Sequence, residues 1–262
     1  MAEISQTRPS LDLTDRVVIV TGGAKGIGKV YSQRLIEAGA RVVIADIDKV
    51  ANDAWADELV KLGGEAISQP TDVASPDSTA AMAQAAIAKW GRIDGLVNNA
   101  SLMSVLERRS WFEIPVEEWD RVMAVNLRGI FLCCRAVYPQ MKSQGRGKIV
   151  NISSNRVWDG TPNRLHYTTS KAGVIGLTRA LSREVGEDNI TVNAITPGFT
   201  QSETQMASSS NSYVGNKTTL NKALNRAQMP DDLVGAVMFL LSDASNFITG
   251  QTLNVDGGQM MH

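Results

Sequence analysis

The sequence predicts a single doubly wound α/β domain, in which a parallel sheet carries helices on both faces. Short apolar runs rich in β-branched residues alternate along the chain with longer segments of helical periodicity. The runs are apolar throughout rather than at every second residue, which indicates strands that are buried on both faces. No stretch rich in Pro, Gly or Ser divides the 262 residues, and α/β domains of this length are commonly undivided.

The predicted elements alternate in order. Strands are expected at residues 17–20, 42–45, 96–97, 148–152, 191–195 and 252–255. Helices are expected at residues 28–38, 50–62, 78–90, 116–141, 167–185 and 230–241. Residues 1–10 are expected to form a flexible tail and residues 11–262 the catalytic domain. The polar, weakly periodic segment near 200–225 is expected to act as a lid over the substrate.

Composition limits the classes of function. Apolar residues make up 43% of the chain and the net charge is −1, so nothing draws the protein to nucleic acid or to an anionic membrane. No segment approaches the roughly 20 apolar residues that span a bilayer, and the polar start lacks the apolar core of a signal peptide. Cys133 and Cys134 are neighbours in an apolar helical stretch, which predicts core packing. We expect a cytoplasmic protein.

A glycine-rich turn follows the first predicted strand. The segment TGGAKGIG places Gly22, Gly26 and Gly28 at G-x-x-x-G-x-G spacing between a strand and a helix. Glycines there let the backbone, including Lys25 and Ile27, approach a dinucleotide pyrophosphate at the N-terminus of the helix. The turn therefore predicts a Rossmann-type dinucleotide site.

The charge near the adenosine ribose predicts NAD. Asp46 ends the second predicted strand, 18 residues after Gly28. A carboxylate there can accept hydrogen bonds from both ribose hydroxyls and repels a 2′-phosphate. Lys25 is a contrary signal, because a cation in the glycine turn could pair with that phosphate. Asp46 acts directly at the 2′ position, so we expect NAD, with NADP the less favoured cofactor.

Tyr167 and Lys171 supply the chemistry. They are four residues apart on a predicted helix, so both side chains can converge on one site. A free tyrosine titrates near pH ~10, too high for proton transfer at neutral pH. A nearby ammonium group and a positive nicotinamide ring are expected to lower the pKa of the phenol. With the dinucleotide site, the pair predicts an oxidoreductase that transfers hydride to or from a nicotinamide.

These residues, with several others, resemble the short-chain dehydrogenase/reductase family in its short single-domain branch. The resemblance begins near Leu11 and follows the motif order of the family to the end of the chain. The matching positions are Thr21 to Gly28, Asp72-Val73, Asn98-Asn99-Ala100, Asn126, Ser154, Tyr167 with Lys171, Pro197-Gly198, Gly250-Gln251 and Val255-Asp256-Gly257-Gly258.

The resemblance implies roles for the cofactor-binding positions. Asp72 and Val73 are expected at the adenine edge, and Asn99 and Ala100 along the adenosine ribose. Ser101 stands where the family usually has glycine, so the backbone there is expected to be less free. Further cofactor contacts are expected from Pro197, Gly198, Phe199, Ser202, Tyr167 and Lys171.

The resemblance also implies a catalytic tetrad of Asn126, Ser154, Tyr167 and Lys171. Ser154 lies 13 residues before Tyr167, and its hydroxyl is expected to orient the substrate oxygen. The backbone of Asn126 is expected to hold a water in a proton relay to Lys171. Ser153 is out of register and is expected to have a structural role.

Members of this branch are commonly homotetramers that pair two long helices. Here those helices are the predicted segments 116–141 and 167–185. Apolar residues on both sides of these helices would allow core and interface faces together; examples are Phe131, Leu132, Val174 and Leu177.

An alcohol dehydrogenase or carbonyl reductase is the expected activity, with three alternatives. A 3-oxoacyl-carrier-protein reductase would share the tetrad but usually uses NADP, which Asp46 disfavours. The chain also resembles pyridoxal 4-dehydrogenase at residues 98–101, 154–155 and 160–163. A non-catalytic dinucleotide-binding regulator is the third alternative, and the complete tetrad disfavours it.

The loop between Ser154 and Tyr167 is expected to line the substrate pocket, because both of its ends meet the reacting oxygen. Its candidate substrate residues are Asn155, Arg156, Trp158 and His166. Mixed aromatic, apolar and polar groups suit a small aromatic or alicyclic alcohol better than a sugar. Arg156 could meet an anionic or phenolic group or point to solvent.

The remaining conspicuous residues have simpler interpretations. Arg108 and Arg109 are expected to form a solvated loop pair. The tryptophans, Trp111 among them, are expected to pack helices. His166 and His262 lack partners at metal-ligand spacing, so we expect no metal site.

Overall fold

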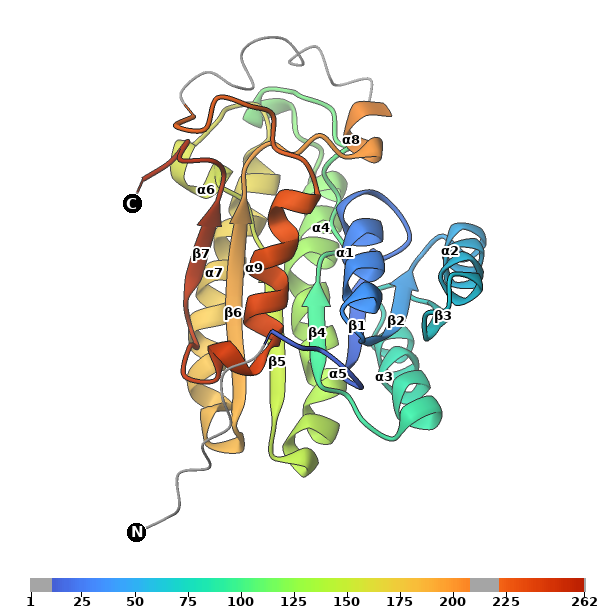
Figure 1. Ribbon diagram of the computed structural model, residues 1–262. Helices are drawn as coiled ribbons and strands as arrows, with labels where there is room; N and C mark the ends of the chain where they lie inside the picture. Colours follow the sequence, from blue (N-terminus) through green and yellow to red (C-terminus); the bar gives the residue numbers. More distant parts are fainter. Residues whose placement is uncertain (1–10, 208–221, 262) are drawn as a thin grey trace.

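The computed structural model describes residues 11–207 and 222–261, and within these residues seven parallel strands form one sheet (Figure 1). Their order across the sheet is β3-β2-β1-β4-β5-β6-β7. The strands are β1 (Val17–Thr21), β2 (Arg41–Asp46), β3 (Ala66–Pro70), β4 (Gly95–Asn98), β5 (Gly147–Ile152), β6 (Ile190–Pro197) and β7 (Thr252–Val255). The strand order changes direction between β1 and β4, so a ligand crevice is expected at their carboxyl ends.

Helices cover both faces of the sheet, as predicted. One face packs against α1 (Gly26–Glu37), α2 (Lys49–Lys61) and α9 (Asp231–Leu241). The other packs against α3 (Pro76–Trp90), α5 (Gly129–Gln144) and α7 (Leu165–Glu184). Two short helices, α6 (Arg156–Asp159) and α8 (Glu203–Ala207), lie beyond the carboxyl ends of the strands in Figure 1.

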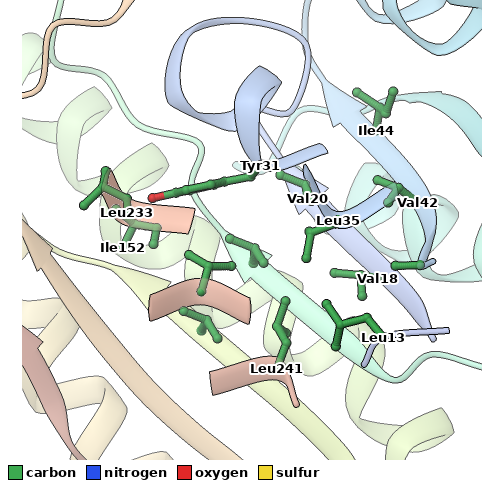
Figure 2. Packing of buried hydrophobic residues seen from close by; sticks show 14 of the residues in the cluster. Leu13, Val18, Val20, Tyr31, Leu35, Val42, Ile44, Ile152, Leu233 and Leu241 are labelled. Atoms are coloured by element: carbon green, nitrogen blue, oxygen red, sulfur yellow. The ribbon is translucent and has the colours of Figure 1, made fainter. Parts of the chain in front are cut away.

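The central strands divide their side chains between two hydrophobic clusters. In β1, Val18 and Val20 belong to the cluster under α1 and α9, whereas Val17 and Ile19 belong to the cluster under α3, α5 and α7. Figure 2 shows the ring of Tyr31, from α1, reaching across the first cluster toward Leu233 and Ile152. Burial on both faces explains why the strands are apolar throughout.

The six predicted strands and six predicted helices are all present, and β3 is an additional strand. Their ends differ from the predicted ends by at most three residues. The prediction missed β3 because its sequence, AISQP, is half polar and ends in proline. It is one of the two edge strands, and its residues are only partly buried, so no apolar run is required there.

A continuous helix runs from α4 (Val116–Met123) through a π-helical turn (Ala124–Arg128) into α5. These 29 residues are long and apolar enough to cross a membrane, judged by length and composition alone. The expectation that no segment approaches the length of a bilayer-spanning helix was therefore too broad. The apolar side of α5, with Cys133 and Cys134 at 1% and 3% exposure, packs into the core. The cysteines are core residues, as predicted, and the helix has the contacts of a core helix.

The predicted tail and much of the predicted lid cannot be compared with the structure. Residues 1–10 and 208–221 lie outside the described residues, so both assignments stay predictions. At the described start of the lid segment, α8 packs beside α1.

A chain of buried side-chain hydrogen bonds ties the central strands to α7. Asn98 Nδ2 donates to Asn151 Oδ1 at 2.8 Å, and Asn151 Nδ2 donates to Thr178 Oγ1 at 3.0 Å. Asn98 and Asn151 are almost fully buried. Asn98 therefore joins β4 to β5.

Removing one member of this chain should destabilise the fold. Asn98→Ala leaves a buried acceptor on Asn151, which is expected to lower the free energy of unfolding by about 1–3 kcal/mol. Urea denaturation measures the change. Gln33→Ala removes an exposed pair with Glu37 and serves as the control, with an expected change within about 0.5 kcal/mol. Equal stability of Asn98→Ala and the parent protein would contradict the assigned role.

Candidate active site

A cavity of about 850 Å³ opens at the carboxyl ends of the central strands. It brings together residues from the ends of β1, β2, β4, β5 and β6. The predicted cofactor-binding residues that line it are Gly22, Lys25, Gly26, Ile27, Asp46, Asp72, Val73, Asn99, Ala100, Tyr167, Lys171, Pro197, Gly198, Phe199 and Ser202. One continuous cavity thus contains both the glycine turn and the Tyr167–Lys171 pair.

The glycine turn has the backbone that the sequence predicts. Gly22 and Gly26 have φ values of +60° and +56°, a region that side chains rarely allow. Gly28 does not line the cavity. A Cβ on Gly28 would lie 2.0 Å from the carbonyl oxygen of Gly22, so glycine is needed for the turn to pack against α1.

The N-terminus of α1 faces the cavity and already binds an anionic group. Lys25, the N-cap residue, makes no side-chain capping bond. Instead the backbone N–H of Gly26 donates to Glu203 Oε1 of α8 at 3.2 Å. A carboxylate therefore stands where the free N–H groups and the helix dipole favour negative charge, and the same position fits a pyrophosphate.

Asp46 and Lys25 are held by separate partners. Asp46 accepts hydrogen bonds from the backbone N–H of Ala24 at 3.2 Å and of Asp48 at 3.1 Å, which fixes its carboxylate at the cavity wall. Lys25 Nζ lies 2.5 Å from Asp48 Oδ2. The cation of the glycine turn is thus already paired with a carboxylate, which weakens it as a partner for a phosphate.

Asn99 and Ala100 anchor the glycine turn to the end of β4. Asn99 Nδ2 donates to the carbonyl oxygens of Thr21 and Gly22, at 3.0 and 3.1 Å. The N–H of Ala100 donates to Thr21 Oγ1 at 3.1 Å. The side chain of Asn99 therefore shapes the turn, in addition to lining the cavity.

Ser154, Tyr167 and Lys171 converge on the cavity from β5 and α7. Ser154 lies two residues after the end of β5, and its side chain hydrogen-bonds with that of Tyr167. Lys171 is 2% exposed and its Nζ donates to the carbonyl of Ile152 at 2.8 Å. Its Nζ lies 5.9 Å from the centre of the Tyr167 ring. The three side chains thus share one buried position.

Burial shifts the pKa values of Lys171 and Tyr167 in the directions that favour the neutral form of each side chain. It lowers the pKa of Lys171 to about 7. It also raises the pKa of Tyr167, against the opposing effects of Ser154, Arg156 and Arg164. The expected lowering by Lys171 is therefore not found in the protein alone, because desolvation of the phenol outweighs the nearby charges.

Asn126 lies outside the cavity lining, in the π-helical turn between α4 and α5. Its Oδ1 accepts from the N–H of Leu102 at 2.7 Å, and its Nδ2 donates to the carbonyl of Leu102 at 3.2 Å and to Ser170 Oγ at 3.2 Å. The side chain thus fixes the loop after β4 against α7. Its backbone role in a proton relay stays a prediction.

The predicted substrate residues divide into two groups. Asn155 and Arg156 line the cavity. Trp158 and His166 are not among the lining residues, so their expected substrate contacts are not supported. His166 is fully buried, with Nε2 3.2 Å from Glu118 Oε1, because the first turn of α7 faces α4.

Two other interpretations also need correction. Arg108 lines the cavity instead of lying in a solvated pair. Its neighbour Arg109 contacts Glu107 and Glu118, at 3.0 and 3.7 Å. Trp111 is 68% exposed, so it does not pack a helix as expected.

Several lining residues gave no signal in the sequence. Gln259 reaches the cavity from the C-terminal segment, where its Oε1 accepts from Asn155 Nδ2 at 3.3 Å. Thr204 and Gln205 come from α8. Only the folded chain brings these distant segments to the site. Among residues 11–207 and 222–261, no group of three or more His, Cys, Asp or Glu side chains could hold a metal ion.

Comparison with known proteins places these features in one group of enzymes. A family model described as "Enoyl-(Acyl carrier protein) reductase" matches residues 22–260. An uncharacterised oxidoreductase of Mycobacterium tuberculosis is 42% identical over 246 residues, which cover 94% of this chain and 98% of the relative. A 3-oxoacyl-[acyl-carrier-protein] reductase of Chlamydia trachomatis is 40% identical over 249 residues, covering 94% and 98%.

A solved structure shares the whole fold. The 7α-hydroxysteroid dehydrogenase complexed with NADH and 7-oxo glycochenodeoxycholic acid superposes with a TM-score of 0.87 at 32% identity. The match covers 96% of this chain and 98% of the other. The likeness therefore extends over the sheet, the cavity and the C-terminal segment.

Removing the carboxylate at the N-terminus of α1 should strengthen cofactor binding. Glu203→Gln removes a charge that competes with the pyrophosphate for the Gly26 N–H, so the Kd for NADH is expected to fall about two- to fivefold. Titration of NADH fluorescence measures it. Glu37→Gln, at the opposite end of the same helix, is the control and should leave the Kd unchanged. Weaker binding by Glu203→Gln would show that the carboxylate supports the site.

Proposed function

Because the chain belongs to the short-chain dehydrogenase/reductase family, we propose that it is an NAD-dependent dehydrogenase of a small cyclic or aromatic alcohol. The family makes it an oxidoreductase that acts on CH–OH groups with a nicotinamide cofactor. The observation that carries the proposal is the single cavity that contains the glycine turn, Ser154, Tyr167 and Lys171.

The catalytic side chains can move a proton and orient an oxygen. A nicotinamide ring, when bound, supplies the hydride acceptor for alcohol oxidation. Ser154 donates or accepts a hydrogen bond at the substrate oxygen. Tyr167 Oη takes the hydroxyl proton in its phenolate form, which a positive nicotinamide ring would favour against the effect of burial. Lys171, with a pKa of about 7, can hold or release a proton near neutral pH beside Tyr167. The buried position of the three groups excludes water from the transfer.

The proposed preference for NAD rests on Asp46. Its carboxylate is fixed at the end of β2, beside the glycine turn, where it would accept ribose hydroxyls and repel a 2′-phosphate. Pairing of Lys25 with Asp48 removes the main contrary signal. The bound NADH of the 7α-hydroxysteroid dehydrogenase supports the same choice by analogy.

The proposed substrate class rests on the apolar residues of the cavity lining. Leu102, Met103, Val105 and Phe199 supply apolar surface there, beside a few polar groups. Such a lining suits a compact ring better than a polyhydroxylated sugar.

Two alternatives are kept. A 3-oxoacyl-carrier-protein reductase is favoured by the 40% identity with the Chlamydia enzyme, and Asp46 is the residue against it. A pyridoxal 4-dehydrogenase-like activity stays a prediction from the motif residues. The convergence of Ser154, Tyr167 and Lys171 gives a non-catalytic regulator no support.

We also propose a cytoplasmic homotetramer that pairs the long helices. Phe131 on α5 is 50% exposed and is available for a helix-pairing interface. Leu132 and Val174 are buried within the chain and supply the core side of these helices.

Loss of the phenol should abolish turnover without loss of the cofactor. Tyr167→Phe keeps the ring and removes the proton-transfer group, so kcat is expected to fall about 10²–10⁴-fold. The Kd for NADH should stay within about twofold, because the ring remains in place. A panel of 1-phenylethanol, cyclohexanol, pyridoxal, glucose and an acetoacetyl thioester, followed by absorbance of NADH, gives the rates and the substrate class. Near-normal activity of Tyr167→Phe would overturn the mechanism.

Neutralising Asp46 should change the cofactor preference. Asp46→Asn retains a hydrogen-bond acceptor but removes the charge that repels a 2′-phosphate. The ratio of kcat/KM for NADP to that for NAD is expected to rise about tenfold or more. Asp53→Asn, on the exposed side of α2, is the control. A native preference for NADP would show that Asp46 does not set the choice.

A further inference from the structure

Three arginines from separate segments lie in the cavity lining or directly behind it. Arg108 lies in the loop between β4 and α4, Arg156 begins α6, and Arg164 precedes α7. Arg108 and Arg156 line the cavity. The backbone N–H of Arg156 donates to Ser154 Oγ at 3.3 Å, which places this residue beside the reacting oxygen.

Arg164 lies behind this wall and is 1% exposed. Its Nη2 donates to the carbonyl of Leu106 at 2.9 Å, and its Nη1 lies 3.3 Å from the sulfur of Met103. These contacts hold the loop after β4 against the start of α7. Arg164 therefore fixes a positive charge under the wall that carries the other two arginines.

The charges of Arg108 and Arg156 act on the buried guanidinium of Arg164. Burial, followed by the charges of Arg156 and Arg108, lowers the pKa of Arg164 to about 10. Asp159 also lines the cavity, and its Oδ1 accepts from the backbone N–H of Thr161 at 2.7 Å. Like charges held together in a partly closed cavity favour the binding of an anion between them.

We propose that Arg108, Arg156 and Arg164, the arginine wall, bind an oxyanion of the substrate. The substrate would then be a hydroxy compound that also carries a carboxylate or phosphate group. This inference rests on the proposed function, because the anion shares the cavity with Tyr167. The planar guanidinium groups of Arg108 and Arg156 match two oxygens of such a group, whereas Arg164 acts through its fixed charge.

An oxyanion on this wall would orient the substrate. The charged group is held on the side of Arg108 and Arg156, and the ring lies against Leu102 and Met103. The hydroxyl then faces Ser154 and Tyr167. A neutral alcohol of the same shape lacks the first of these contacts, so it is expected to bind more weakly.

Binding to the NADH-loaded enzyme tests the proposal without turnover. The probes are benzoate, phenyl phosphate and the neutral benzamide, titrated against NADH fluorescence. At least one of the two anions should bind about tenfold more tightly than benzamide, and Arg156→Gln and Arg108→Gln should each reduce that preference at least about threefold. The relative affinities of benzoate and phenyl phosphate distinguish the carboxylate from the phosphate.

Arg109→Gln provides the matched control, because Arg109 is adjacent to Arg108 but contacts Glu107 and Glu118 instead of the cavity. It should leave the anion preference intact. Arg156→Lys should restore part of the preference, because it keeps the charge and loses the two-pronged contact. Thermal melting and the Kd for NADH identify any variant that fails to fold.

Turnover separates this proposal from the proposed function. The substrates are the meta and para isomers of (1-hydroxyethyl)benzoate and the corresponding neutral benzamides. The acids should have the higher kcat/KM, and Arg156→Gln should reduce it for the acids alone. Equal binding of anions and benzamide, or equal losses in Arg109→Gln and Arg156→Gln, would overturn the arginine wall. Absence of NADH formation from every alcohol would count against the proposed function, while the titrations still decide anion binding.

Discussion

Two reciprocal hydrogen bonds between β5 and α7 fix the position of the catalytic groups. Ser153 Oγ donates to the carbonyl of Lys171 at 2.7 Å, and Lys171 Nζ donates to the carbonyl of Ile152 at 2.8 Å. These contacts are buried and lock the end of the strand to the first turns of the helix. The structural role expected for Ser153 is thus a positioning one, since the distance between Ser154 and Tyr167 depends on it.

The same contacts hold Tyr167 and Lys171 in a buried position, where the charged form of each side chain is unfavourable. Burial acts on Tyr167 and Lys171 in opposite directions on the pH scale, but it favours the neutral form of each. Charges that arrive with ligands therefore have a strong effect on both groups, because few water molecules screen them. This makes proton transfer at Tyr167 dependent on what the cavity binds.

The two ends of the cavity have different charges. Near the glycine turn, Asp46 and Asp48 line the wall, and Glu203 lies at the N-terminus of α1. Backbone N–H groups, rather than free cations, are available there for phosphate oxygens. Arg156 lines the same cavity two residues after Ser154, so it belongs to the end that holds the catalytic groups, and Arg108 is a further lining residue. This asymmetry gives an extended ligand one preferred direction in the cavity.

The sequence by itself determined the order of elements, the glycine turn and the identity of the reactive side chains. Strands buried on both faces must be apolar throughout, and a sharp turn at a helix N-terminus needs glycine, so both features are visible locally. The edge strand β3 was missed because partial exposure permits the polar residues of its sequence. Local sequence patterns thus predict the features that depend on burial and backbone conformation at each position.

Only the tertiary structure decided which loop residues reach the cavity. Arg108 and Gln259 are far from Tyr167 in the sequence and follow no periodic pattern, yet Arg108 lines the cavity and Gln259 meets Asn155 there. His166, adjacent to Tyr167, points away toward Glu118, because successive residues of a helix face different directions. The raised pKa of Tyr167 likewise depends on burial, which arises from the packing of distant segments rather than from neighbouring residues.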